Sequence, residues 1–223
     1  MSVDEICEKL VTWLRNSVKH SGAKGVVFGM SGGLDSSIIS VLCKKAFKED
    51  LLGLIMPCHS DIKDEKDAIF LAERFDIKHK LINLDSVYNE MIMILDECDD
   101  RVVKANIKPR LRMTVLYYYA GLNNYLVIGS ENKSEISVGY FTKHCWSDLL
   151  PLGNLTKSVV KELGEYLDIP KEIIDKTPSA GLWSGQTDES EMGVSYTQLD
   201  NYLLAGKAEN TKIRQRLENL IAK

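Results

Sequence analysis

The stretch that decides the fold is KGVVFGMSGGLDSSIISVLCKKAF, residues 24–47. Its first part, KGVVFGM, is a short run of β-branched and aromatic residues bounded by glycine, which is typical of a buried strand. Its last part, DSSIISVLCKKAF, predicts the helix that follows. Between them, GMSGGLDSS at 29–37 packs two adjacent glycines, an acid and three hydroxyls into a few positions. The stretch therefore predicts a strand, a glycine-rich turn and a helix in direct succession.

A glycine-rich turn before a helix presents backbone N–H groups to an anion, and the helix dipole assists. Gly32 and Gly33 allow a close backbone approach and positive φ, and three nearby serines add hydroxyl donors. The lysine of the GxxxxGK[ST] phosphate loop is absent, and Asp35 stands in this loop instead. Mg²⁺ explains an acid beside phosphates, because it prefers carboxylate and phosphate oxygens. The alternative is a plain Gly-Gly turn with Asp35 and Ser36 as helix caps.

Strands and helices continue to alternate on both sides of this stretch. Apolar residues at helical spacing from Ile6 to Leu14 predict an opening amphipathic helix. Further strands are expected at 51–57, 79–84 and 124–130, and further helices at 61–75, 86–95 and 110–122. This order predicts an α/β fold, a three-layer arrangement with a parallel sheet and helices on both faces. Ligands of such sheets bind beyond the carboxyl ends of the strands, where each motif here falls.

The pattern changes after Ser130. Residues 131–155 are polar, glycine-punctuated and poorly periodic, which favours an active-site segment over another strand and helix. A helix is expected at 157–167, and a long polar loop at 177–196 is typical of a functional lid or a mobile segment. Helices near 196–204 and 210–222 are expected to form a C-terminal cap. No linker rich in Pro, Gly or Ser separates these parts, so one domain is predicted.

Composition narrows the class of protein. With 223 residues, 44% hydrophobic and 27% charged, the chain can bury a sizeable core. A net charge of −4 argues against nucleic acid as the main partner. The five cysteines are scattered and form no CxxC pair, which disfavours disulfides and zinc. The N-terminus resembles neither a signal peptide nor a membrane span. We expect a soluble cytoplasmic protein with no membrane partner.

The SGGxDS pattern in its strand, loop and helix context resembles the pyrophosphate-binding loop of the ATP pyrophosphatase, or PP-loop, superfamily. The resemblance implies a Rossmann-like fold of the adenine nucleotide alpha hydrolase type. It also implies that ATP is cleaved between its α- and β-phosphates, that an acyl or base group is adenylated, and that the loop holds pyrophosphate. The ATP-binding residues it implies here are Gly29, Met30, Ser31, Gly32, Gly33, Leu34, Asp35 and Ser36.

Five segments of the second half point to one family within that superfamily. They are NIKPRLRM (106–113), LVIGSENKSE (126–135), GYFTK (139–143), PLGNLTK (151–157) and PSAGLWSGQTDESEMGVSY (178–196). In this order they resemble the ammonia-dependent NAD synthetases, and the resemblance covers most of the chain. It implies that deamido-NAD, ATP and ammonia are converted into NAD, AMP and pyrophosphate through an adenylated carboxylate.

The same resemblance implies roles for particular residues. Asp35 and Glu135 match magnesium ligands. Ser130, Lys157 and Ser179 match positions that contact ATP, and Arg110, Lys143 and Asp148 match positions that contact deamido-NAD. No side chain is assigned as a catalytic acid or base. Outside these motifs, Lys157 and Glu135 would be interpreted as ordinary surface charges, and Arg110 as part of a basic helical face.

Two features depart from the family pattern. Family members usually carry an aromatic residue and Gly-Asp-Gly after FTK, whereas HCWS follows here at 144–147 and the stretch to Pro151 is shorter. They also usually end with a His-Lys pair, whereas this chain ends RQRLENLIAK. The alternative is therefore a PP-loop amide ligase that adenylates a related carboxylate. A tRNA thiolation enzyme would need a cysteine pair and a basic surface, and the intact acids Asp35 and Glu135 argue against a degenerate regulatory protein.

The family also implies partners. Its members are homodimers whose deamido-NAD site draws on both subunits, so a homodimer is expected. The chain, residues 1–223, leaves no room for a glutaminase domain beside the synthetase domain. A single synthetase domain is therefore expected, with free ammonia or a separate glutaminase as the nitrogen source.

Overall fold

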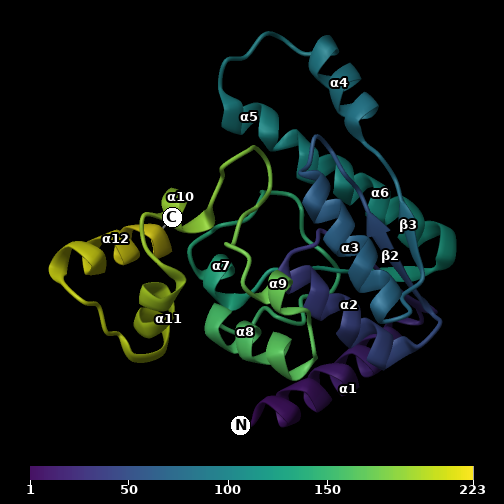
Figure 1. Cartoon of the computed structure of the whole chain (residues 1–223), viewed down its shortest axis with the longest axis horizontal. Coiled ribbons are helices and arrows are strands. Elements are labelled where there is room, and N and C mark those ends of the chain that lie inside the picture. Colours follow the sequence, from purple (N-terminus) through teal and green to yellow (C-terminus); the bar gives the residue numbers. More distant parts are fainter. Residues whose placement is uncertain (223) are drawn as a thin grey trace.

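A computed structural model describes residues 1–222, and at its centre lies a parallel sheet in the order β3-β2-β1-β4 (Figure 1). The strands are β1 (Gly25–Gly29), β2 (Leu51–Ile55), β3 (His79–Leu81) and β4 (Tyr125–Ile128). Strand β1 lies between β2 and β4, with Val27 opposite both Leu52 and Val127. The glycine-rich turn therefore leaves the sheet at its middle. The predicted α/β class is confirmed.

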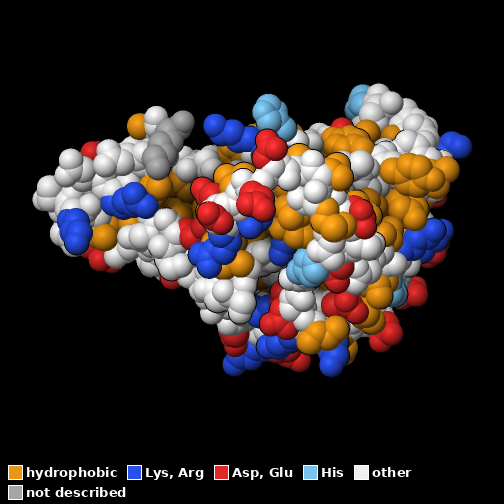
Figure 2. All heavy atoms as spheres, turned by 90° about the horizontal axis from the view of Figure 1, so that it is seen from above, with side chains coloured by type: hydrophobic (Ala, Val, Ile, Leu, Met, Phe, Trp, Pro, Cys, Tyr) orange, Lys and Arg blue, Asp and Glu red, His pale blue; other side chains and the backbone are white. Residues whose placement is uncertain are grey.

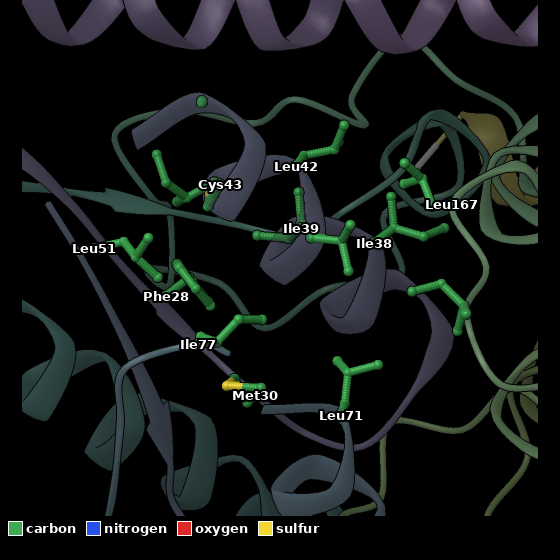
Figure 3. Close-up of a cluster of buried hydrophobic side chains, with 14 of the residues drawn as sticks. Phe28, Met30, Ile38, Ile39, Leu42, Cys43, Leu51, Leu71, Ile77 and Leu167 are labelled. Atoms are coloured by element: carbon green, nitrogen blue, oxygen red, sulfur yellow. The ribbon is translucent and has the colours of Figure 1, made fainter. Parts of the chain in front are cut away.

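Alternate strand residues pack against helices on opposite faces, as expected for a sheet buried on both sides. On one face Phe28 and Met30 pack against apolar residues of helices that cover this side. These helices are α1 (Val3–Ser21), α2 (Leu34–Phe47), α3 (Ile62–Arg74) and α8 (Lys157–Tyr166). Figure 3 shows this cluster, with Ile38, Ile39 and Leu42 of α2 at its centre. On the other face Val27 and Leu54 pack against α6 (Ile107–Asn123).

A third apolar cluster joins the C-terminal helices. It includes Met192, Leu199 and Leu217. The helices are α10 (Asp188–Met192), α11 (Tyr196–Ala205) and α12 (Thr211–Ile221), drawn at the left of Figure 1. Helix α11 packs against α7 (Lys133–Ser137) and α8. The C-terminal helices thus lie against the two elements that follow β4.

Several boundaries differ from the sequence-based expectation. Strand β2 ends at Ile55, two positions before Pro57, whose missing N–H cannot extend a ladder. Strand β3 ends at Leu81, and α6 begins at Ile107. Helix α4 (Asp85–Ile94) was expected, but the short helices α5 (Arg101–Ala105), α7, α9 (Lys171–Ile174) and α10 were not. Helices of four or five residues are too short to display a 3.6-residue period.

A helix that crosses a bilayer needs about 20 consecutive apolar residues. None of the helices in residues 1–222 has both the length and the apolar character that a bilayer span requires.

Candidate active site

The glycine-rich turn lies at the carboxyl end of β1 and opens α2. Gly32 has φ +74°, and a Cβ atom there would overlap the main-chain carbonyl of Asp64. Gly33, also expected to take positive φ, has φ −93° and is the extended N-cap of α2. That expectation is wrong, because one left-handed residue is enough to turn the chain. The alternative of Asp35 and Ser36 as caps is also wrong, since both lie inside the first turn of α2.

The serine hydroxyls brace this turn. Ser36 and Ser37 both donate to the Gly33 carbonyl, with oxygen separations of 3.0 and 2.7 Å. The hydroxyl oxygens of Ser31 and Ser36 lie 2.8 Å apart. These side chains hold the backbone in shape, which leaves the first amides of α2, without a partner within the helix, as the groups that could donate to an anion.

Lys176 holds the same turn from outside. Its Nζ donates to the Gly32 carbonyl at 2.8 Å and to Asp64 Oδ1 at 2.8 Å, and it lies 2.6 Å from Asp67 Oδ2. The two carboxylates belong to α3, so one ammonium ties the turn to a neighbouring helix. The sequence contained no local signal for this contact, because Lys176 lies in a segment far along the chain.

Beside the turn, Asp35, Glu135 and Lys157 form a partly buried charged cluster. Lys157 Nζ contacts Asp35 Oδ2 and lies 3.4 Å from Glu135 Oε1. The side chains are 11% (Lys157), 18% (Asp35) and 15% (Glu135) exposed. They come from α2, α7 and α8, so three of the predicted residues are brought together.

Burial and mutual charge shift the pKa values of this cluster. Burial raises the pKa of Glu135, and the nearby Asp35 carboxylate adds to the rise. Burial alone would lower the pKa of the Lys157 ammonium, but the Asp35 and Glu135 carboxylates outweigh it and raise that pKa. Lys157 is therefore a fixed positive charge between two acids.

Asn132 joins the two acids and was not predicted as a site residue. Its Nδ2 donates to Asp35 Oδ1 at 3.0 Å, and its Oδ1 accepts from the Glu135 N–H at 3.1 Å. Its own N–H donates to Glu135 Oε2 at 3.2 Å. The signal available in the sequence was the capping-box spacing of Asn132 and Glu135.

A third carboxylate, Asp188, lies next to this cluster. The Tyr196 hydroxyl donates to Asp188 Oδ2 at 2.8 Å and lies 3.3 Å from Glu135 Oε1. Asp188 is buried, which raises its pKa, and its Oδ1 has no hydrogen-bond partner in the described chain. Its N–H donates to the Pro178 carbonyl at 3.0 Å. Asp188 thus connects the 178–187 loop to the acids.

These residues fit a hard divalent cation. Three carboxylates face one ammonium, and one buried carboxylate oxygen is unsatisfied. Within residues 1–222, no three His, Cys, Asp or Glu side chains are grouped closely enough to form a cage by themselves. Mg²⁺ usually takes one or two carboxylates and completes its shell with water and substrate phosphates. Asp35 and Glu135 would hold it in this way.

The remaining predicted residues lie elsewhere. Ser130 lies two residues after the end of β4, and Ser179 is exposed, with its Oγ accepting from the Gly181 N–H at 3.1 Å. In residues 1–222 no hydrogen bond joins either serine to the Asp35 cluster. Arg110 donates to the Lys143 carbonyl at 3.4 Å, so these two residues lie together.

Asp148 has both carboxylate oxygens engaged by the protein. Its Oδ2 accepts from the Val127 N–H of β4 at 2.8 Å, and its Oδ1 accepts from the Tyr117 hydroxyl at 3.2 Å. Burial, followed by the Asp148 charge, raises the pKa of Tyr117 to about 12. The observed role of Asp148 is to fasten the segment after GYFTK to the sheet.

Comparison with known proteins supports one family. Relatives include the NH(3)-dependent NAD(+) synthetase of Carboxydothermus hydrogenoformans, 49% identical over 92% of this chain and 86% of that protein. The corresponding protein of Finegoldia magna is 44% identical over 99% of this chain and 92% of its own length.

Similar solved structures include synthetases as well. NMN synthetase from Francisella tularensis superimposes with a TM-score of 0.95 at 42% identity, covering 100% of this chain and 94% of that one. The NH3-dependent NAD synthetase of Campylobacter jejuni gives 0.82 at 32% identity, with the same two coverages. The sequence profile described as NAD synthase matches residues 6–221, and the chain belongs to the NAD synthase family.

Proposed function

We propose that the protein is an ATP-dependent ligase that amidates deamido-NAD with ammonia, releasing NAD, AMP and pyrophosphate. The observation that carries this proposal is the cluster of Asp35, Glu135 and Lys157 beside the glycine-rich turn. The sequence relationship to NH(3)-dependent NAD(+) synthetases supports the nicotinate carboxylate as the acceptor of AMP.

The chemistry requires this arrangement. A carboxylate is a poor acyl donor, so AMP from ATP is first attached to it as a leaving group. Bound Mg²⁺ would offset negative charge on the phosphates. The amides at the start of α2 hold the pyrophosphate, and Lys157 adds a positive charge where charge accumulates. Ser130 and Ser179 are proposed to contact ATP, and Arg110, Lys143 and Asp148 the nicotinate substrate.

A second candidate substrate is the nicotinate mononucleotide, whose amidation gives NMN. The structure matches an NMN synthetase with a TM-score of 0.95, against 0.82 for an NAD synthetase at equal coverage. Asp148 is also occupied by protein donors, and the segment after GYFTK lacks Gly-Asp-Gly. The Asp148 contacts and the missing Gly-Asp-Gly both lie in the region proposed to bind deamido-NAD.

A product assay tests both candidates. The protein is incubated with ATP, MgCl₂, ammonium and either deamido-NAD or nicotinate mononucleotide, and AMP, pyrophosphate and amide are quantified. We expect AMP and pyrophosphate in equal amounts with the amide, and the ratio of kcat/KM values identifies the substrate. Asp35→Asn is the inactive control, because it removes a magnesium ligand. Formation of ADP and phosphate would overturn the proposal.

We further propose a homodimer formed through α4, α5 and α6. No residue of α4 is buried, and Ile94, Val103 and Tyr118 are among the exposed large hydrophobic side chains of these helices. Figure 2 views the molecule from the side where α4 and α5 lie and shows hydrophobic side chains on that face. A second copy would cover these side chains, as the family resemblance predicts.

Replacing both Val103 and Tyr118 with aspartate is expected to shift the protein from dimer to monomer in analytical ultracentrifugation. The physical reason is the cost of burying four charges across a two-fold apolar contact. The matched control is Ile62→Asp, which changes an equally exposed hydrophobic residue of α3. A wild-type protein that sediments as a monomer, or a double variant that stays dimeric, would contradict the interface.

The proposed reaction needs a source of ammonia, which enters free or from a separate glutaminase. The cytoplasm is the proposed compartment, and a single synthetase domain is the proposed organisation. All five cysteines are free thiols, which agrees with the reducing cytoplasm. The packing of α11 on α7 and α8 supports a single domain.

A further inference from the structure

A buried carboxylate outside the cluster contacts both chain segments that supply Glu135 and Lys157. This is Asp200 of α11, which is 2% exposed. Its Oδ1 accepts from the Ser134 hydroxyl at 2.5 Å, and its Oδ2 accepts from the Ser158 N–H at 2.8 Å and hydroxyl at 2.5 Å. Ser134 immediately precedes Glu135, and Ser158 immediately follows Lys157.

Asp200, Ser134 and the first turn of α8 are joined in a closed ring of hydrogen bonds. Ser134 Oγ also accepts from the Lys157 N–H at 3.0 Å. The N-cap of α8, Thr156, makes no side-chain hydrogen bond to the helix. The first amides of α8 are therefore satisfied by Ser134 and Asp200, which belong to other helices. A carboxylate at this position is also favoured by the helix dipole.

Helix α7 needs such an anchor. It has five residues, too few to be stable by itself. Asn132 fixes one of its ends to Asp35, and Ser134 fixes it to Asp200. The separation of 3.4 Å between Lys157 Nζ and Glu135 Oε1 thus depends on where α7 and α8 are held.

We propose that Asp200 is a positioning residue that sets the spacing of Glu135 and Lys157 for the adenylation step. The inference rests on the proposed function. Asp200 acts through Ser134 and Ser158, and its loss displaces the two segments relative to each other. Small displacements of groups that act on one substrate have large effects on rate.

Asp200→Asn tests the proposal, because it keeps the size of the side chain and removes one of the two acceptor oxygens. We expect kcat to fall by about 10- to 100-fold, as for residues that orient metal ligands. The Mg²⁺ concentration for half-maximal rate should rise, while the KM for the nicotinate substrate stays near the wild-type value. The increase in Tm on adding Mg²⁺ and ATP should shrink, which is a readout independent of turnover.

A stability control separates positioning from simple destabilisation. Asn210→Ala removes an exposed N-cap of α12, whose side chain accepts from the Ile213 N–H at 3.0 Å. It should lower Tm and leave kcat and the Mg²⁺ dependence unchanged. If Asp200→Asn behaves like Asn210→Ala, Asp200 is structural only and the proposal is wrong.

Two milder variants keep the test decisive if Asp200→Asn does not fold. Ser134→Ala and Ser158→Ala each remove one hydroxyl and leave the carboxylate in place. Each should lower kcat, and their effects should be non-additive, because both act through Asp200. Additive or absent effects would overturn the proposal. If the wild type releases no AMP with either nicotinate nucleotide, the proposed function fails, and the Tm response to Mg²⁺ and ATP still tests Asp200.

Discussion

Replacing Lys157 with methionine is expected to cost about 3–5 kcal/mol of unfolding free energy and to abolish measurable turnover. The ammonium lies between Asp35 and Glu135, and all three side chains are largely buried. Methionine has a similar length but no charge, so two carboxylates are left without their protein cation. Urea denaturation measures the loss of stability, and the release of AMP measures turnover.

The response to Mg²⁺ provides a second measurement on the same variant. A divalent cation bound by Asp35 and Glu135 stabilises the folded state by mass action. In Lys157→Met no ammonium competes for these oxygens, so MgCl₂ should raise Tm more than in the wild type. Lys161→Met is the control, because Lys161 forms an exposed pair with Asp175 at 3.8 Å and such pairs contribute little. Equal stability of Lys157→Met and Lys161→Met would contradict the buried cluster.

Replacing Gly32 with alanine is the second change with a large expected effect. The residue has φ +74°, and the added Cβ would overlap the Asp64 carbonyl. Either the turn or α3 must move, and Lys176 joins both. We expect a lower Tm and a loss of kcat of about 100-fold, because the backbone amides proposed to bind the pyrophosphate are displaced.

Gly22→Ala separates the cost of the left-handed backbone from the cost of the overlap with Asp64. Gly22 also has φ +74°, but no atom lies within 4 Å of a Cβ built there. Its replacement carries only the cost of the left-handed conformation, about 1–2 kcal/mol. Comparing the two variants by thermal melting and by activity isolates the effect of the overlap. If Gly32→Ala were as active and as stable as Gly22→Ala, the turn would not need its observed shape.

The parts of the fold that local pattern determines were predictable. A buried strand is recognised from a short run of β-branched and aromatic residues, and a long helix from the spacing of its apolar residues. Strand β1 and helix α2 could therefore be predicted from the single stretch around Asp35. The helix beginning at Lys157 was also expected and is observed at that residue. Short helices such as α7 lacked a period, and their positions depend on caps and tertiary contacts. Asp188 and Asp200 lie in segments whose partners are distant in sequence, so no local pattern marked them.

The candidate site was predicted in part. Resemblance selected Asp35, Glu135 and Lys157, and the structure brings them together. It did not indicate Asn132, because an asparagine before a helix is ordinarily only a cap. Nor did it indicate that Asp148 is engaged by the backbone of β4, since that contact depends on the path of the segment after GYFTK.

The dependence of α8 on Asp200 has a consequence for the order in which the protein matures. Chains are synthesised from the N-terminus, so the residues of the sheet and of α8 are made before residue 200. The first turn of α8 receives the Asp200 carboxylate only when α11 docks. A nascent chain that ends before α11 therefore lacks the carboxylate that accepts from the first turn of α8, and we expect the proposed nucleotide site to be completed only after α11 has docked.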